Sequence, residues 1–559
     1  MYSRSRARPS GRGSDPRAAL TDPLAPDLVR ALCEASAYPG DPSASGGVEW
    51  IQTHLSHVFL TGRRVYKLRK AVDLGFVCFA SRAERNADCL REVALNRRLA
   101  PDVYLGVAPV ETAPGGVRVG SVAEALVGGG EHCVVMRRLP AGRDALSLLH
   151  AGRLPGEWLD RVAERVAEFH AAHGLGVPAP FSASEWLERC TRPVEQNFAL
   201  LAEAAGRIFP GGLLDRAREA ARAFVARHPR CFEARRLAGR AVDGHGDLHL
   251  QHVWFETDAA DPIFVDCIEF SEGLRRIDAA AEVAFLAMDL RYRGEAGRAA
   301  RFLRRYARAS DDFDLYSVVD YFLSYRAAVR AKVASVAACD PGIESLQRER
   351  AAESARRHLE LAVAALLPAS GGALVLVGGA VGTGKSTAAE ALADRVGGVV
   401  IASDRVRKRL AGLAPTDRAA AGPERGIYTT ERTERVYAGL VVRAVPVVAS
   451  GRVAILDATF ATRAHRRRAR EAADAQGVAV RFVETRCPPA VARERLARRA
   501  AAGTDPSDAG PELHARSLAR FEPIAPEEGI PADVLDTADP AWRDELARRV
   551  SAWGLGRPV

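Results

Sequence analysis

The sequence is poor in lysine and in aromatic residues, and it has no long apolar run. Only five of its 559 residues are lysine and 6% are aromatic, so arginine carries nearly all of the positive charge. No stretch approaches the ~18 uninterrupted apolar residues of a membrane helix, and we expect no membrane partner. The net charge of +9 is compatible with a nucleic-acid or phosphate partner, but a solvated, arginine-rich surface explains it more simply.

Paired cysteine motifs and a secretory signal are also absent. The nine cysteines are scattered from Cys33 to Cys487 without a CxxC pair, which is typical of reduced thiols in a cytoplasmic protein and disfavours structural zinc. The first residues, MYSRSRARPSGRGSDPRA, lack the apolar core of a secretory signal. We therefore expect a disordered arm over residues 1–25, with an export address as the lesser alternative.

The remaining chain shows two patterns. Residues 26–365 form one region, with strand-like segments up to about residue 140 and mostly helical segments over 141–365. A small strand-rich lobe before a larger helical lobe is the layout of kinase-like enzymes. After LLPASGG, the expected linker around 366–372, apolar runs such as ALVLVGG and RVAILDA alternate with helical segments. The alternation predicts an α/β domain with a parallel sheet over 373–559, following an α+β domain.

The strongest motif is GAVGTGKS, which matches the phosphate-binding pattern G-x-x-x-x-G-K-[ST] without a gap. It follows the apolar run ALVLV and opens the helical run STAAEALADRV, which is the context that this loop requires. Its glycines let backbone N–H groups close around phosphate oxygens, while Lys385 reaches the outer phosphates and Ser386 offers its hydroxyl to Mg²⁺. A chance glycine-rich turn is the alternative. The residues expected to hold ATP are Gly379, Gly382, Thr383, Gly384, Lys385, Ser386 and Thr387.

Two aspartates and a basic helix complete this expected site. Asp404 follows an apolar run, so we expect it at the carboxyl edge of the sheet as the base for a substrate hydroxyl; a helix N-cap is the alternative. Asp457 ends the run RVAILD and is expected to orient Mg²⁺-bound water. Arg495 and Arg498 or Arg499 share one helix face and are expected to close over the transferring phosphate. A solvated basic helix is an equal alternative.

This half resembles the P-loop small-molecule kinases, in the neighbourhood of gluconate kinase and the zeta-toxin kinases. The resemblance rests on GAVGTGKS, SDRVRKRL, LDATF, RERLARR and DPSDA, in that order. It implies a P-loop NTPase fold with a helical lid over residues 488–512. It also implies phosphoryl transfer from ATP to a hydroxyl group, with Asp404 as the base, and it leaves the substrate open.

A second set of residues lies in the first region. The stretch HGDLHLQH places Asp247 five residues before His252, and protein-kinase catalytic loops place the catalytic Asp five residues before a metal-binding Asn. Asp266 follows in IFVDCIEF, an expected strand, at the range where kinase-like enzymes carry a Mg²⁺-binding Asp. Upstream, Lys67 is expected to bind phosphates and Glu92 to hold this lysine as an ion pair. Each residue alone also fits an ordinary surface charge, and their order favours a nucleotide site.

This region resembles the aminoglycoside phosphotransferase-like kinases, whose loop is HGDxHxxN. With the P-loop half included, the chain resembles a bacterial family called bifunctional aminoglycoside phosphotransferase/ATP-binding proteins, in which VYKLRK, HGDLHLQH, DCIEF and the phosphate loop recur in this order. The resemblance implies a two-lobed, protein-kinase-like domain with Asp247 as the catalytic residue and Mg²⁺ at Asp266. The family name does not establish drug phosphorylation.

The sequence departs from the family pattern at two points. No G-x-G-x-x-G precedes Lys67, so we expect backbone and the hydroxyls of Thr53 or Ser56 to cover the phosphates. His252 replaces the metal-binding Asn, and imidazole is a poor ligand for Mg²⁺, which prefers oxygen. We therefore expect Asp266 to make the main metal contact, and His252 to bind a second metal weakly, to act through water, or not to be a ligand.

The sequence thus predicts a cytoplasmic phosphotransferase with two modules, dependent on ATP and Mg²⁺, that acts on a hydroxyl group of a small molecule. The main alternative is that one module, more readily the first because of His252, is a degenerate nucleotide-binding regulator of the other. A nucleic-acid end kinase is a third hypothesis, ranked low because aromatic residues are sparse near the basic runs. The sequence identifies neither the acceptor nor the oligomeric state.

Overall fold

The structure is a computed structural model in which the chain forms two compact units. One comprises Met1–Arg153 with His245–Arg276, and the other comprises Leu154–Gly244 with Ile277–Val559. The described residues are 22–25, 27–73, 77–113, 116–210, 212–367, 371–414, 417, 426–502 and 513–555. The predicted arm over residues 1–25 lies almost wholly outside this range, as does the DPSDA segment.

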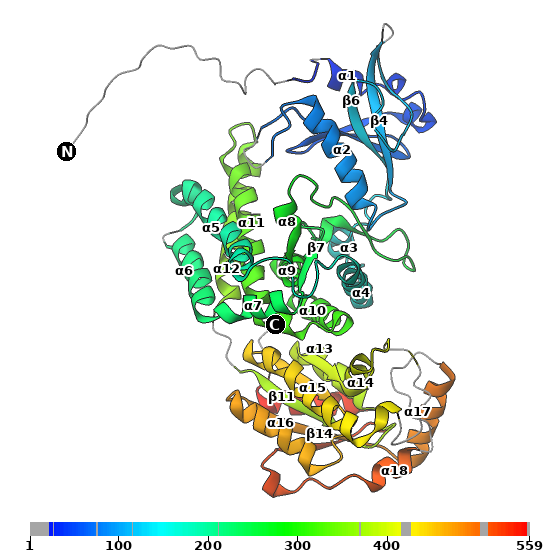
Figure 1. The fold of residues 1–559 in the computed structure, drawn as a ribbon, viewed down its shortest axis with the longest axis vertical. Coiled ribbons are helices and arrows are strands. Elements are labelled where there is room, and N and C mark those ends of the chain that lie inside the picture. Colours follow the sequence, from blue (N-terminus) through cyan, green and yellow to red (C-terminus); the bar gives the residue numbers. More distant parts are fainter. Residues whose placement is uncertain are drawn as a thin grey trace, which may run out of the picture. The chain divides into compact units, whose positions relative to one another are not determined.

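The first unit is built on a six-stranded antiparallel sheet with helix α2 (Arg82–Asn96) packed against it (Figure 1). The helix begins at a capping box, in which Ser81 and Glu84 satisfy each other's backbone N–H groups. Its side chains Cys89 and Val93 are buried against the sheet. In sheet order the strands are β1 (Glu49–Gln52), β2 (Ser56–Leu60), β3 (Arg64–Arg69), β6 (Glu131–Arg137), β4 (Tyr104–Ala113) and β5 (Gly116–Val119).

The HGDLHLQH loop belongs to the same unit, although it lies far along the chain. It is followed by β8 (Val253–Trp254) and β9 (Ile263–Phe264), which pair antiparallel. The predicted strand IFVDCIEF is wrong beyond Phe264. The physical reason is Asp266, which takes a left-handed backbone conformation with φ of 65° that a strand cannot contain.

The second unit begins with helices, as the sequence pattern predicts. Its central helix is α9 (Ala279–Tyr292), which is apolar and buried from Ala279 to Leu290. Asp278 caps this helix by accepting the Ala280 N–H (2.7 Å) and also binds the buried Arg235. The other long helices are α4 (Gly156–Ala172), α5 (Ala183–Ile208), α6 (Leu213–Arg227), α7 (Pro229–Leu237), α10 (Ala296–Ser310), α11 (Val319–Cys339) and α12 (Ser345–Ala365).

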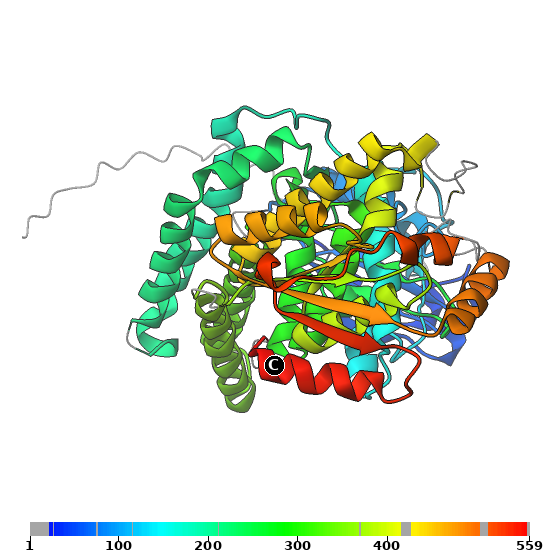
Figure 2. The same ribbon diagram turned by 90° about the horizontal axis from the view of Figure 1, so that it is seen from below.

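The rest of the second unit is a parallel five-stranded sheet with helices on both faces (Figure 2). Its central strand, β11 (Ala373–Gly378), is fully buried, as expected when both faces are covered. In sheet order the strands are β12 (Val399–Ala402), β13 (Val453–Asp457), β11, β14 (Ala479–Arg486) and β15 (Ala532–Asp536). The helices are α13 (Lys385–Val396), α14 (Ser403–Leu410), α15 (Thr430–Ala449), α16 (Arg463–Ala475), α17 (Pro489–Ala502), α18 (Leu513–Ala519) and α19 (Trp542–Trp553).

Arginine–carboxylate pairs join the helical part of this unit to its sheet part. Arg443 on α15 donates two hydrogen bonds to Asp311 (2.7 and 2.6 Å). Arg308 on α10 donates to Glu390 (2.7 Å) on α13, the helix that follows the phosphate loop. Charge-assisted hydrogen bonds of this kind add geometric specificity as well as binding energy. The pair between Arg308 and Glu390 therefore fixes the position of α13 relative to α10.

The fold class predicted from the sequence is confirmed: a mixed α/β arrangement with a parallel sheet in the second half. The domain boundaries stay a prediction, since the expected linker at 366–372 lies between α12 and β11 and is only partly described. Among the described helices, none is both long enough and apolar enough to span a bilayer.

Candidate active sites

The first candidate site is centred on Lys67, in the middle of β3. Strand pairing with β2 and β6 fixes its position, opposite Val58 and Val134. Its Nζ lies 2.9 Å from Glu92 Oε1 on α2 and 2.6 Å from Asp266 Oδ1. The structure therefore brings together three residues that the sequence assigned to one nucleotide site.

A buried network around Arg69 supports this lysine and was not foreseen from the sequence. Arg69 lies two residues after Lys67 and binds Asp88 (2.7 Å), Glu92 (2.6 Å) and Glu269. Glu92 thus accepts from a cation on each of its two oxygens, which fixes its orientation. Two features of the sequence could have indicated this network. Lys67 and Arg69 are two residues apart on a strand, and Asp88 and Glu92 are four residues apart on a helix, so each pair shares one face.

Ser56 is a correction to the expected phosphate cover. Its side chain is fully buried, and its hydroxyl accepts a hydrogen bond from Arg69 Nη1 (2.9 Å). It therefore braces the arginine network and is not free to meet a phosphate. The other expected hydroxyl, that of Thr53, lies in the exposed turn between β1 and β2 and accepts from the Ser56 N–H (3.0 Å).

Asp266 has a left-handed backbone conformation that neighbouring side chains hold in place. Its N–H donates to Tyr104 Oη (3.0 Å), and the next N–H, that of Cys267, donates to Asn96 Oδ1 (2.8 Å). A left-handed conformation is costly for a residue other than glycine and persists where the surroundings enforce it. These contacts supply that enforcement, and they aim the half-exposed carboxylate at Lys67.

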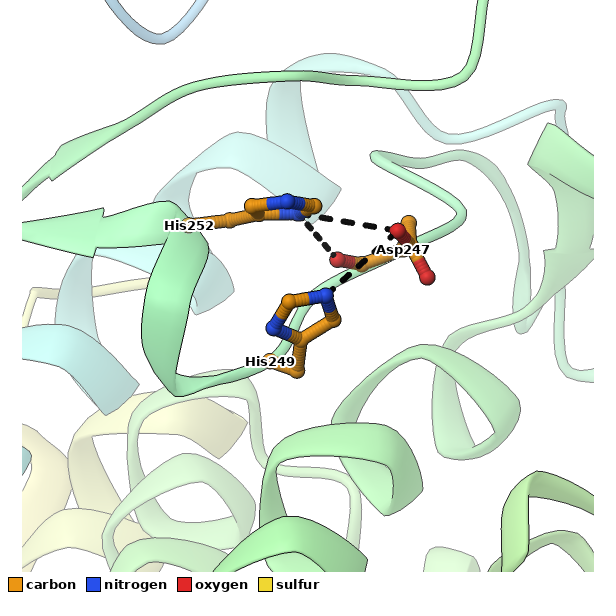
Figure 3. A group of neighbouring side chains, drawn as sticks. All are labelled: Asp247, His249 and His252. Atoms are coloured by element: carbon orange, nitrogen blue, oxygen red, sulfur yellow. Dashed lines mark hydrogen bonds and ion pairs between the residues drawn. The ribbon is translucent and has the colours of Figure 1, made fainter. Parts of the chain in front are cut away.

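The catalytic-loop candidates Asp247 and His252 form one cluster with His249 (Figure 3). Asp247 Oδ2 lies 3.5 Å from His249 Nε2 and 3.7 Å from His252 Nδ1. His252 Nδ1 also lies 2.9 Å from the main-chain oxygen of Asp247, and His252 Nε2 lies 3.6 Å from Asp266 Oδ2. His252 therefore stands between the two aspartates, whereas His249 was not singled out from the sequence.

Charge pairing decides the protonation of this site. Although burial opposes each charge, Asp266 and Glu92 raise the pKa of Lys67 above its ordinary value. Likewise, although desolvation opposes ionisation, Lys67 and His252 lower the pKa of Asp266, and the hydrogen bond and charge of His249 lower the pKa of Asp247. A protonated lysine and two carboxylates thus face one another at neutral pH.

The second candidate site is the GAVGTGKS loop, which joins β11 to α13 as expected. Gly379, Gly382 and Gly384 all have positive φ values, of 133°, 85° and 85°. A Cβ atom at Gly379 would lie 2.4 Å from the main-chain oxygen of Thr485. Glycine is therefore required there both by conformation and by space, which is the property of a loop that wraps a phosphate.

Polar side chains at the carboxyl ends of the strands surround this loop. Asp457 ends β13, is buried, and shares a hydrogen bond with Ser386. Asp404 lies in the first turn of α14, whose N-cap is Ala402, so the N-cap alternative does not hold. Lys385 Nζ donates to the main-chain oxygen of Ala380 (3.0 Å). Burial lowers the pKa of Lys385 and raises that of Asp457 to about 6.

Two threonines that sequence reasoning missed hold the loop. The hydroxyls of Thr383 and Thr485 lie 2.7 Å apart, and Thr537 Oγ1 donates to the main-chain oxygen of Thr383 (2.7 Å). Thr485 lies near the end of β14, which pairs with β11, and Thr537 directly follows β15, the strand on the other side of β14. Their position at the carboxyl edge of a parallel sheet was the available signal. Thr387, expected to contact the nucleotide, is exposed on the first turn of α13.

The basic helix α17 does not present Arg495 and Arg498 together. Arg495 donates to Thr537 Oγ1 and to its main-chain oxygen (both 2.8 Å), beside Gly384. Arg498 pairs with Glu494 (3.2 Å) on the exposed face. Burial lowers the pKa of Lys385, the charges of Asp457 and Asp404 oppose that shift, and the charge of Arg499 adds to it. The part of the expected lid between 503 and 512 lies outside the described residues.

Comparisons with known proteins cover both halves of the chain. A family model described as an AAA domain matches residues 374–524. The uncharacterized protein Rv2004c of Mycobacterium tuberculosis (strain ATCC 25618 / H37Rv) is 34% identical over 492 residues, which are 87% of this chain and 92% of that protein.

Two solved structures match different shares of the chain. A choline/ethanolamine kinase family protein from Mesorhizobium loti is 16% identical with a TM-score of 0.35, and covers 60% of this chain and 98% of its own. A gluconokinase from Sinorhizobium meliloti 1021 is 22% identical with a TM-score of 0.24, and covers 34% of this chain and 98% of its own.

Proposed function

The chain belongs to one family with the uncharacterized protein Rv2004c of Mycobacterium tuberculosis, and from that premise we propose an ATP-dependent phosphotransferase with two nucleotide sites. Each site transfers the γ-phosphoryl group of ATP to a hydroxyl group of a small molecule in the cytoplasm. The observation that supports this most is the ion pair between Lys67 and Asp266, which stand 199 positions apart in the sequence and lie 2.6 Å apart.

In the first site, side chains bind the nucleotide. Lys67 pairs with phosphate oxygens, and Glu92 holds its ammonium group in place. Asp247, which is ionised at neutral pH, orients the acceptor hydroxyl and accepts its proton as the new bond to phosphorus forms. Mg²⁺, when bound, would neutralise phosphate charge, and the residue that fits it is Asp266, since hard cations select carboxylate oxygen.

In the second site, the main chain binds the nucleotide. The N–H groups of Gly379–Ser386 surround the phosphates, and Lys385 leaves Ala380 to reach them. Ser386 and Asp457, which already share a hydrogen bond, supply the oxygen atoms that suit Mg²⁺. Asp404, at the carboxyl edge of the sheet, accepts the proton of the acceptor hydroxyl.

The test is phosphoryl transfer by the full chain and by Lys385→Ala, Asp247→Ala and the double variant. Each protein is incubated with ATP and, separately, with sugars, aminoglycosides, nucleosides and nucleotide sugars, and the mass gain of one phosphoryl group is measured. We expect each single variant to lose its own acceptor and the double variant to lose both. Lys332→Ala, a lysine that binds Asn197 on the helical side, is the matched control. Full activity in the double variant would refute the proposal.

A regulatory role of the first site is the second candidate. It is favoured by His252, which places imidazole where an oxygen ligand for Mg²⁺ is expected. The measurement is ATP binding to the Lys385→Ala chain with and without Mg²⁺. Metal-independent binding without turnover supports a regulator, whereas binding that requires Mg²⁺ and leads to turnover supports an active first kinase.

A further inference from the structure

We propose that Asp247, His249 and His252 form a binding site for one divalent transition-metal ion of the zinc type, which Mg²⁺ does not fill. The ligand atoms of these three side chains all lie within 4.8 Å of one another (Figure 3). The two separations from Asp247 Oδ2 are 3.5 and 3.7 Å. Zinc–ligand bonds of about 2.0–2.1 Å at tetrahedral angles place ligand atoms about 3.4 Å apart, so one ion fits after small side-chain shifts.

The donor set selects the class of ion. Two imidazoles and one carboxylate suit zinc and its borderline neighbours. The same set is unfavourable for Mg²⁺, which requires near-octahedral oxygen ligation. Mg²⁺ therefore suits the Asp266 carboxylate near the nucleotide, whereas Asp247 and the two histidines suit a different metal.

The loop is held in the required shape by its own backbone. A short turn, η4 (Leu250–His252), brings His252 over His249, so that the ring centroids lie 3.9 Å apart with a tilt of 33°. The Val265 N–H donates to the main-chain oxygen of His252 (3.0 Å), and His245 bonds the main-chain oxygen of Val265 (2.8 Å). Because these contacts fix the backbone on both sides, little ordering is needed before an ion binds.

Occupation of this site has a consequence for the proposed kinase. The ion binds the Asp247 carboxylate, which the proposed function uses to accept a proton, so the filled site and phosphoryl transfer exclude each other. His252 Nδ1 gives up its contact with the main-chain oxygen of Asp247 when it ligates. Only this consequence rests on the proposed function, because metal binding requires neither nucleotide nor turnover.

The experiment is equilibrium dialysis of the full chain against Zn²⁺, with Mg²⁺ in large excess and no nucleotide, followed by metal analysis. The variants are His249→Ala, His252→Asn and the double variant, with His228→Ala as a matched control at the start of α7. The nine cysteines are the same in every variant, so a difference in bound Zn²⁺ between variants reports the histidine site. We expect the wild type and the control to bind one Zn²⁺ more than the double variant, and each single variant to bind it at least tenfold more weakly.

Thermal unfolding gives a second readout, because an ion that binds the folded state raises the melting temperature. Zn²⁺ should raise the Tm of the wild type and of His228→Ala more than that of the double variant. Equal Zn²⁺ content in the wild type and the double variant would overturn the proposal, as would displacement of Zn²⁺ by Mg²⁺ at similar concentrations. Neither measurement depends on phosphoryl transfer, so the zinc proposal can be confirmed or refuted even if the proposed kinase activity is absent.

Discussion

The two candidate sites solve the same electrostatic problem with different parts of the chain. In the first, a lysine is held by carboxylates and an arginine network that extends from Ser56 to Glu269. In the second, eight consecutive residues, 379–386, form a loop whose glycines adopt positive φ values, and its lysine contacts a main-chain oxygen. The comparison teaches that the lysine of a site built from side chains contributes to both phosphoryl transfer and folding stability. The lysine of a main-chain loop can contribute to transfer without stabilising the fold.

The largest expected contrast is between Lys67→Met and Lys385→Met. Each should lower transfer at its own site by about 10²–10³-fold, the cost of removing one preorganised electrostatic partner. Lys67→Met also leaves buried Glu92 with one cation fewer, which should lower the free energy of unfolding by about 1–3 kcal/mol. Lys385→Met should leave the free energy of unfolding unchanged or raise it, because burial already disfavours the charged ammonium group of Lys385. Denaturant unfolding and turnover measure both effects.

The control for this pair is Lys332→Met, which removes a charge from helix α11 and touches neither site. It should change neither transfer activity. An equal loss of stability in Lys67→Met and Lys385→Met would show that the two lysines are supported alike, and the distinction between the sites would fail.

A second test acts on the main chain of the phosphate loop. Gly379→Ala adds a Cβ atom 2.4 Å from the main-chain oxygen of Thr485, in strand β14, which is paired on both sides. Gly477 is the control, because it has φ of 63° but no neighbouring atom within 4 Å of an added Cβ. We expect Gly379→Ala to weaken ATP binding at least tenfold, about 1.4 kcal/mol, measured in a Lys67→Met background to isolate this site. Gly477→Ala should cost about 1–2 kcal/mol of stability from conformation alone and leave ATP affinity intact.

The same comparison explains what the sequence could and could not predict. The phosphate loop was predictable to the residue because its signal is contiguous: a strand, a glycine pattern and a helix in fixed order. The convergence of Lys67, Glu92 and Asp266 was predictable, because a kinase-like resemblance supplied the template; their roles stay a prediction.

The supporting residues could not be predicted, for physical reasons. Arg69 and Glu269 contact each other across 200 positions of the chain, and no local pattern distinguishes a buried arginine from a surface one. Asp266 was expected in a strand, because its neighbours are apolar and β-prone; tertiary contacts from Tyr104 and Asn96 override that local preference.

A third test uses the opposite pKa shifts of Asp457 and Asp266. Burial raises the pKa of Asp457 to about 6, so the folded state binds more protons than the unfolded state between about pH 4 and 6. The free energy of unfolding should fall as pH rises through this window, by about 3 kcal/mol at most. Asp457→Asn should flatten the slope.

For Asp266 the sign reverses, because Lys67 and His252 lower its pKa despite partial desolvation. Its contribution to stability is present above the ordinary carboxyl pKa and is lost as pH falls below it. Asp266→Asn should therefore reduce the loss of stability on acidification below about pH 4. Chemical unfolding across pH, without nucleotide or Mg²⁺, measures both variants, and profiles that change in the same direction would contradict the assignment.

The smallest expected effect separates the arginines of α17. Arg498 pairs with Glu494 on the surface, with side-chain exposures of 71% and 66%, so Arg498→Ala should change the free energy of unfolding by no more than about 0.5 kcal/mol. Arg495→Ala should weaken ATP binding instead, because Arg495 positions Thr537, which in turn bonds the main chain of the phosphate loop at Thr383. If Arg495 and Arg498 closed together over the phosphate, the two alanine variants should lose turnover equally. If Arg498→Ala instead stays near the wild type, the helix acts on the phosphate loop through the face that carries Arg495 and Arg499, whose charge affects Lys385.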